Sequence, residues 1–174
     1  MVAQGVPALG RTRQEAKSSP PRRAKAMAQT FTNLLTPIIF STKDRRPLIL
    51  PQFRAHLHAY LGGIIRELGG RARLINGTAD HIHLLAGLPP TLALADALRV
   101  IKANSSRWVR EQKTRRFGWQ AGYGAFSVSE SKAAEVMRYI ANHEQHHRKR
   151  TFQDEFLGFL KRNNIGYDER YIWQ

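Results

Sequence analysis

The sequence has no cysteine among its 174 residues. This absence excludes disulfide bonds, zinc sites built from thiolates and a cysteine nucleophile, and it suits a reducing compartment. No apolar run approaches the length that a membrane-spanning helix needs. The first residues are polar and basic, without the apolar segment typical of a secretory signal. We therefore expect a cytoplasmic protein that does not enter a membrane.

Acidic residues are also few, at 13 Asp and Glu against 28 Lys and Arg, which gives a formal net charge of +15. Six of the basic residues and one acid, Glu15, lie in residues 1–26, so the rest of the chain still carries a large positive charge. Such a surplus indicates a polyanionic partner, and nucleic acid is the usual one. A merely soluble basic surface is the alternative explanation.

Residues 1–26 are rich in Pro, Gly, Ser, Ala and Arg and lack hydrophobic periodicity, which predicts a disordered basic tail before one folded domain at 27–174. In that domain, apolar patterns predict strands at 31–42, 72–75, 81–88 and 123–129. They predict helices at about 53–68, 92–111, 133–147 and 151–163, the last entered through a capping box from Thr151 to Asp154. The β-α-β-β-α-β order is typical of an α+β, ferredoxin-like split βαβ antiparallel sheet, here with additional C-terminal helices.

Two local signals refine this topology. Asn76-Gly77 between the second and third strands predicts a hairpin turn. Pro37 lies inside the first strand, and because proline has no N–H to donate to a ladder, we expect an edge or a bulge there.

Two histidines on the third strand are the first candidate site residues. In the string Asp80-His81-Ile82-His83, alternate strand residues face the same side, so His81 and His83 project together while Ile82 enters the core. Two imidazoles on one strand make half of a metal site. A pair of surface histidines is the simpler interpretation, because one His-x-His pattern is a weak motif.

Tyr139 and His143 form the second candidate group. They are four residues apart on a predicted helix and therefore share one helical face. A tyrosine with an ordinary pKa of about 10 is a weak nucleophile unless a metal or a base assists it. An amphipathic core tyrosine and a solvated histidine would explain the same residues without any chemistry.

Longer strings carry a more specific signal. Residues 31–47 (FTNLLTPIIFSTKDRRP), 79–85 (ADHIHLL), 119–129 (WQAGYGAFSVS) and 139–173, with YIANHEQHHRKRTFQDEF and YDERYIW, resemble the single-tyrosine HUH transposases of bacterial insertion sequences. The resemblance is greatest to their REP-associated relatives, and it spans nearly everything after Met27.

This resemblance implies metal-dependent nicking and rejoining of hairpin-bearing single-stranded DNA through a 5′-phosphotyrosine. It further implies a homodimer with a shared sheet. His81 and His83 match the two metal-binding histidines of the family, and Tyr139 matches its nucleophile. The family usually has glutamine, as third ligand, where this chain has His143, and commonly histidine where it has Pro37. The resemblance thus implies a divalent metal, Mg²⁺ or Mn²⁺. An imidazole at 143 shifts the preference from Mg²⁺ towards Mn²⁺ or Zn²⁺, because imidazole is a softer ligand than an amide oxygen.

Basic residues of the second predicted helix and the segment after it are candidate phosphate contacts: Lys102, Arg107, Arg110, Arg115 and Arg116. Trp119 or Tyr123 could stack on bases, although Trp119 is as easily a core residue. Three other functions stay open. They are an RNA-recognition module, which has the same element order, a catalytically silent descendant that still binds DNA hairpins, and a metal-dependent hydrolase that uses water in place of Tyr139.

Overall fold

The computed structural model of the chain describes residues 31–112, 114–147, 151–168, 170, 172 and 173. The tail predicted at residues 1–26 and the predicted domain start at Met27 lie outside these residues. The elements in chain order are β1 (Leu35–Ser41), the short 3-10 helix η1 (Lys43–Arg45), α1 (Pro51–Glu67), β2 (Arg71–Gly77), β3 (His81–Gly87), α2 (Leu94–Gln112), β4 (Gly124–Ala125), α3 (Glu130–Ala141), α4 (His143–His147) and α5 (Phe152–Arg162). Among the helices described, none is long and apolar enough to span a membrane.

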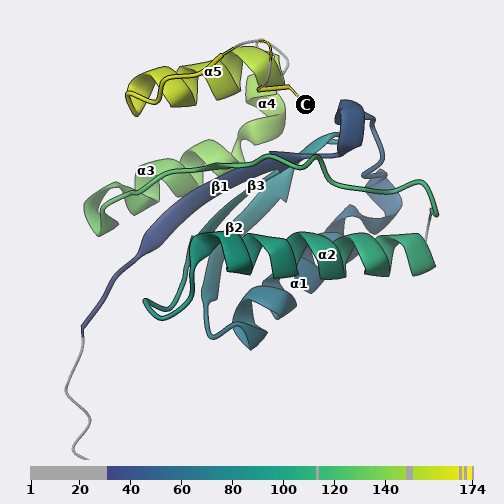
Figure 1. Cartoon of the computed structure of the whole chain (residues 1–174), viewed down its shortest axis with the longest axis horizontal. Helices are drawn as coiled ribbons and strands as arrows, with labels where there is room; N and C mark the ends of the chain where they lie inside the picture. The colour runs from purple at the N-terminus through teal and green to yellow at the C-terminus, as the bar shows by residue number, and fades with distance from the viewer. Residues whose placement is uncertain (1–30, 113, 148–150, 169, 171, 174) are drawn as a thin grey trace, which may run out of the picture. The chain divides into compact units, whose positions relative to one another are not determined.

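The described strands form one four-stranded sheet in the order β2-β3-β1-β4, and every neighbouring pair is antiparallel. β3 inserts between β1 and β2, which is the split βαβ arrangement, so the predicted α+β class and topology are confirmed. α1 and α2 lie against one face of the sheet, whereas α3, α4 and α5 lie on the other (Figure 1). The sheet therefore separates two layers of helices.

The main core lies between the sheet and the α1/α2 layer. Ile38 and Phe40 of β1, with Ile82 and Leu84 of β3, are buried there against α1 and α2. Because side chains alternate along a strand, the residues between them face α3 and α5. Ile39 accordingly packs with aromatic residues of α5 in a separate cluster. The second face is where polar residues of β3 can meet the C-terminal helices.

Pro37 produces neither the edge strand nor the bulge that its position predicted. β1 is an internal strand, and its register with β3 runs without interruption from Leu35 to Ser41. The backbone carbonyl of Pro37 instead points to the β4 side, where it accepts the N–H of Phe126 at 3.0 Å. Because proline cannot return that bond, the ladder is incomplete at this point. The predicted strand at 123–129 is accordingly reduced to Gly124–Ala125, although Val128 still donates to Leu35.

β2 and β3 form the predicted hairpin, but the connection does not lie at Asn76-Gly77. Both residues belong to β2, where they pair with His83 and Ile82, and residues 78–80 make the connection. A β-carbon on Gly77 would lie 2.3 Å from the backbone oxygen of His81. The glycine is thus explained by the close approach of two strands rather than by a turn.

The helix predicted at 133–147 is two helices. α3 ends at Ala141, and α4 begins at His143 after Asn142. The predicted capping box of the last helix is confirmed, because the Thr151 hydroxyl accepts the N–H of Asp154 and the Asp154 carboxylate accepts the N–H of Thr151. This box fixes where α5 starts.

Gly77→Ala should lower the free energy of unfolding by about 2 kcal/mol, because its β-carbon meets backbone that cannot move aside. Gly63→Ala is the matched control. It lies within α1 and has no atom within 4 Å of the new β-carbon, so it should stabilise the protein by about 0.5–1 kcal/mol. Urea unfolding measures both, and equal effects of the two substitutions would contradict the close approach of the strands.

Candidate metal and tyrosine site

His81 and His83 lie on the face of β3 that the C-terminal helices cover. Both side chains are buried, with exposed fractions of 1% and 4%, and their ring centroids are 5.3 Å apart. The sequence analysis placed these side chains on one side of the strand, and the structure confirms that geometry. The alternative of two surface histidines is excluded by their burial.

The orientation of His81 is set by its neighbours in the β2–β3 connection. Its Nδ1 lies 2.7 Å from the Asp80 carboxylate and 2.8 Å from the Thr78 hydroxyl. Burial raises the pKa of Asp80, but the hydrogen bond and charge of His81 outweigh this effect and bring the pKa to about 2. A carboxylate that holds one ring nitrogen turns the other towards the interior. Nε2 of His81 accordingly lies 2.6 Å from Nε2 of His143.

Tyr139 and His143 reach the same place from the other side. The ring of His143 is fully buried, with its centroid 4.0 Å from that of His83 and 6.4 Å from that of Tyr139. The Tyr139 ring lies 6.3 Å from His83. The residues of the two candidate groups, far apart in sequence, therefore meet between β3 and the α3–α4 segment.

The break between α3 and α4 positions His143. The side-chain amide of Asn76 donates to the carbonyl oxygens of Ile140 and Ala141, at 2.8 and 3.2 Å. In a continuous helix these carbonyls would accept N–H groups four residues later. Asn76 satisfies them from the neighbouring strand, so the chain can turn at Asn142 and direct His143 inwards.

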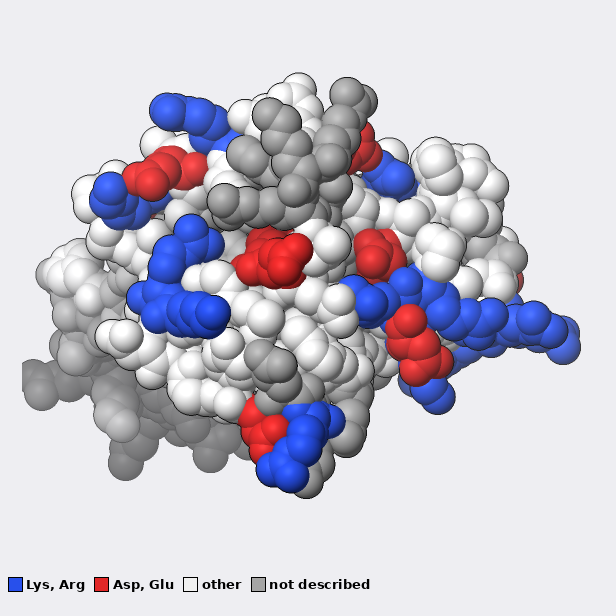
Figure 2. All heavy atoms as spheres, turned by 90° about the horizontal axis from the view of Figure 1, so that it is seen from above, with Lys and Arg blue, Asp and Glu red and all other residues white. Residues whose placement is uncertain are grey.

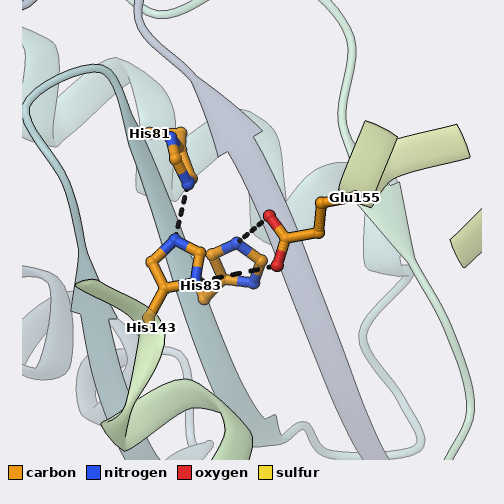
Figure 3. A group of neighbouring side chains, drawn as sticks. All are labelled: His81, His83, His143 and Glu155. Atoms are coloured by element: carbon orange, nitrogen blue, oxygen red, sulfur yellow. Dashed lines mark hydrogen bonds and ion pairs between the residues drawn. The ribbon is translucent and has the colours of Figure 1, made fainter. Parts of the chain in front are cut away.

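Glu155 is the site residue that the sequence analysis missed. It lies in the first turn of α5 with an exposed fraction of 6%. Its carboxylate accepts the Tyr139 hydroxyl. The same carboxylate lies 3.3 Å from Nε2 of His83 and 3.7 Å from Nδ1 of His143 (Figure 3). One carboxylate therefore contacts both the candidate nucleophile and two of the candidate ligands.

A signal for Glu155 was present in the sequence. The apolar stripe of α5 runs through Phe152, Phe156, Phe159 and Leu160, and Glu155 occupies a position on that same stripe. An acid on the buried side of an amphipathic helix is uncommon unless it is paired. The charge pattern at the start of a helix offered a simpler explanation, since acids there are favoured by the helix dipole.

The protonation of Glu155 follows from these contacts. Burial raises the pKa of its carboxyl, but the hydrogen bond and charge of His83, followed by the hydroxyl of Tyr139 and the charge of His143, hold it well below its ordinary value. The carboxylate is therefore ionised at neutral pH, although it lies inside the protein. Ionised acid in this position serves as a metal ligand or as an acceptor for the phenol proton.

The donor set fits a divalent metal. His81, His83, His143 and Glu155 each offer one ligand atom, and these four atoms lie within 4.8 Å of one another. Three imidazoles and one carboxylate suit Zn²⁺, and after it Mn²⁺, better than Mg²⁺, which is usually bound through oxygen ligands alone. The predicted metal histidines thus belong to a buried cluster of four, completed by an acid from α5.

The five basic residues predicted as phosphate contacts belong to α2 or follow it, on the opposite side of the sheet. Lys102, Arg107 and Arg110 belong to α2, and Arg115 and Arg116 follow it. α2 packs with α1 against the main core, away from α3 and α5 (Figure 1). The structure does not bring these residues to the histidine cluster.

Lys102 has a structural contact in this region. It is half-buried, its ammonium group donates to the carbonyls of residues 120–122 at 2.5 to 3.0 Å, and burial lowers its pKa. Trp119 packs edge-to-face on Phe40 and donates to Ser105, as expected of a core residue, whereas Tyr123 is 40% exposed. A groove of about 460 Å³ runs between α2 and this loop, and its lining includes Arg99, Lys102, Arg110 and Tyr123.

The family model of IS200-like transposases matches residues 30–143, which is more than half of the chain. The chain belongs to the IS200-like transposase family. Membership assigns the transposase a DNA-cleaving enzyme activity. The match ends at His143, so α5 and Glu155 lie beyond the part that the family model covers.

Relatives agree with this assignment. The transposase is 29% identical over 128 residues to the transposase of insertion sequence element IS200 from Salmonella typhimurium, covering 67% of this chain and 80% of that protein. It is 26% identical over 110 residues to the ISDra2 transposase TnpA of Deinococcus radiodurans, covering 59% and 79%.

Solved structures share the fold. A putative transposase of Deinococcus radiodurans superposes with a TM-score of 0.56 at 23% identity, covering 66% of this chain and 94% of that chain. The REP-associated tyrosine transposase bound to a REP hairpin superposes with a TM-score of 0.53 at 15% identity, covering 69% and 72%. Both are similar to this chain in architecture.

Asn76→Ala should lower the free energy of unfolding by about 1–3 kcal/mol, because the carbonyls of Ile140 and Ala141 lose the side-chain amide that donates to them. It should also weaken Mn²⁺ binding, since His143 loses the support of the break that directs it. Urea unfolding and titration calorimetry measure the two effects. Asn104→Ala, on α2, is the control and should change neither; unchanged Mn²⁺ affinity in Asn76→Ala would refute the positioning role.

Mn²⁺ at a hundredfold excess over its Kd should raise the Tm of the transposase by roughly 5–10 °C. Glu155→Gln, which removes the anionic donor, should lose more than half of this shift. Glu67→Gln, an exposed substitution of the same kind on α1, should keep all of it. Thermal melts with Mn²⁺ and Mg²⁺ measure the effect. A full shift in Glu155→Gln would remove the carboxylate from the ligand set.

Proposed function

We propose that the protein nicks and rejoins single-stranded DNA, with Tyr139 as the nucleophile beside a divalent metal held by His81, His83 and His143. The observation that carries the proposal is the contact of the Tyr139 hydroxyl with Glu155, inside a group of four metal-type donors. Membership of a DNA-cleaving transposase family supports it independently. We include Glu155 as the fourth ligand and Mn²⁺ as the metal that the donor set favours over Mg²⁺.

Tyr139 would attack the scissile phosphorus through its phenolic oxygen. The new bond joins this oxygen to phosphorus, and the bond from phosphorus to the 3′ oxygen breaks, leaving a 5′-phosphotyrosine and a free 3′-hydroxyl. Tyr139 gives up one proton and the leaving oxygen takes up one, so the step is balanced. The Glu155 carboxylate already accepts the hydrogen bond of this hydroxyl and lies where it can take the proton. A bound divalent metal would polarise the phosphate and offset charge on its oxygens.

Rejoining is the reverse of this step. The phosphotyrosine ester retains the energy of the broken bond, so the 3′-hydroxyl of another strand can displace Tyr139. No nucleotide cofactor is needed. Burial of the cluster excludes bulk water, which favours strand transfer over hydrolysis of the ester.

The DNA contacts are proposed for the α2 side of the sheet. The groove between α2 and residues 119–123 combines cationic side chains with the exposed ring of Tyr123, a combination suited to a DNA backbone and its bases. Arg107, Arg115 and Arg116 are exposed nearby in sequence and would extend it. On the face seen in Figure 2, the Lys and Arg side chains among the described residues occur in separate groups with acidic residues among them.

The substrate we propose is single-stranded DNA that carries a hairpin, because a relative of the same fold was solved on a REP hairpin. A homodimer in which two sheets join is the proposed assembly. β4 supports it, since it is the edge strand beside β1 and forms a ladder of only two residues. An edge of this kind can accept a strand from a second copy.

One observation favours a second candidate, a DNA-hairpin-binding protein without nicking activity. With His143 and Glu155 added to His81 and His83, a bound metal would have four protein donors. Closed sets of four are typical of structural metal sites, whereas catalytic sites keep a position open for substrate. In that case a bound metal would stabilise the folded protein, and Tyr139 would be a packing residue.

Tyr139→Phe should abolish covalent protein–DNA adduct formation, by at least about 1,000-fold, because the ring stays and only the nucleophilic oxygen is removed. The Kd for the same DNA should stay within about twofold. The assay incubates protein, Mn²⁺ and single-stranded DNA from the genomic flanks of its own gene, and resolves adducts on a denaturing gel. Tyr60→Phe, which removes a hydroxyl from the opposite helix layer, is the control.

The outcomes separate the candidates. An adduct in Tyr139→Phe would refute the nucleophile. Tight, metal-dependent hairpin binding without any adduct from the unmodified protein would favour the binding protein, and His143→Gln would then be the first variant examined for recovered nicking. Cleaved DNA without a covalent adduct, from both the unmodified protein and Tyr139→Phe, would indicate hydrolysis by water.

A further inference from the structure

A cavity of about 370 Å³ adjoins the site on the side away from His81. Strands β1 and β3 form its floor, α3 forms one wall, and α5 with the segment after β4 forms the other. His83 and Tyr139 line it as well, so it is continuous with the candidate nucleophile. Its size lies within the range of roughly 300–1,000 Å³ that is usual for small-ligand sites. The rest of its lining that matters here is Pro37, Phe126, Val136, Phe159, Arg162 and Asn163.

The walls of this cavity are mainly apolar, and the acid in their lining, Glu135 of α3, is paired with Lys132. The rings of Phe126 and Phe159 stack with centroids 5.4 Å apart and planes within 23° of each other, and Val136 lies on the facing helix. The exposed side chain of Arg162 places its guanidinium 4.9 Å from the Phe159 ring. A planar cation held over an aromatic wall can stack on a flat ligand or pair with a phosphate. The cavity therefore suits a planar, partly apolar group attached to an anion.

A polar group stands at the mouth, where a ligand edge would lie. The Asn163 side-chain nitrogen donates to the carbonyl of Phe159 at 2.8 Å, which leaves its amide oxygen to act as an acceptor. Asn163 thus pairs an acceptor with the cation of Arg162 at one edge of an otherwise apolar space. Groups of this kind fix the orientation of a ring that carries hydrogen-bond donors.

We infer that this cavity is a nucleobase site, which takes the base of a nucleotide adjoining the phosphate that Tyr139 attacks. The inference rests on the proposed nicking function. A phosphate beside Tyr139 puts its own sugar and base within reach of the cavity, because the two sites share His83 and Tyr139. Bases of single-stranded DNA are unstacked and are commonly bound between apolar and guanidinium surfaces.

A base seated here would fix which phosphate meets the nucleophile. Since one nucleotide is held on both sides of its sugar, the scissile bond is aligned without a contact to the bond itself. The cavity would also discriminate among bases at this one position, through the acceptor of Asn163 and the volume between Val136 and Phe159. Cleavage specificity would thus include a direct contact at the cut, in addition to recognition of a hairpin elsewhere.

The test measures binding, in the Tyr139→Phe protein with Mn²⁺, so that cleavage cannot interfere. The probes are fluorescent single-stranded oligonucleotides from the genomic flanks of the gene, each with one nucleotide replaced by an abasic residue, and anisotropy gives the Kd. We expect one position at which loss of the base weakens binding about tenfold, within the range for stacking of one base. Val136→Trp, which fills the cavity, should weaken binding of the intact DNA to a similar degree. The Val136→Trp protein should therefore bind the intact and the abasic probe with equal affinity.

Ala134→Trp is the matched control, because it adds the same side chain to an exposed position of the same helix and should leave both affinities unchanged. The inference fails if no abasic position weakens binding, if Val136→Trp keeps the full difference between intact and abasic DNA, or if no probe binds. Adduct formation by the unmodified protein is scored separately. Base-dependent binding without an adduct would overturn the nicking function and support the nucleobase site. If Val136→Trp leaves the amount of adduct unchanged, the nicking function stands and the nucleobase site is refuted.

Discussion

Between α5 and the sheet, one carboxylate meets two imidazoles and a phenol. Glu155 is ionised and almost wholly buried, which would be unfavourable in an apolar interior if His83, His143 and Tyr139 did not surround it. Removing one partner of such a buried charge typically lowers the free energy of unfolding by about 3–5 kcal/mol. α5 is thus attached to β3 and to the α3–α4 segment through polar contacts at the site itself, as well as through the aromatic cluster around Ile39.

This arrangement couples stability to chemistry. The groups that would bind a metal and activate a tyrosine are the same groups that compensate the buried charge of Glu155, so we expect substitutions of the histidines or of Glu155 to change stability as well as chemistry. A metal would strengthen the coupling, because it replaces the close contact of His81 with His143 by bonds to a shared cation. The match to the family model ends at His143, so Glu155 of α5 lies outside the matched residues.

The two layers of helices differ in the sites that they carry. The α1/α2 layer covers the main core and carries the basic groove, whereas the α3–α5 layer holds the ionisable cluster and the cavity beside it. Strand alternation makes this division, since neighbouring residues of β3 enter opposite layers. Asn76 connects the sheet to the site, because its backbone pairs with His83 in the β2–β3 ladder while its side chain caps the end of α3. Asn76, which the sequence pattern predicted to lie in a turn, instead stabilises the end of α3, where the chain changes direction at Asn142.

The sequence by itself determined the α+β topology and the shared side of His81 and His83, because side chains alternate along a strand. It placed Tyr139 and His143 on one helix, whereas the structure ends α3 at Ala141 and brings His143 to the site from the start of α4. Local strings also marked the start of α5 correctly. Only the tertiary structure decided the rest. Glu155 joins the site because α5 folds back across the sheet, and the α2 cations lie away from it because α2 packs on the other face. Pro37 shortens β4, and Asn76 breaks a helix, through partners distant in sequence. Contacts of this kind depend on which elements come together in space, and no local pattern encodes that.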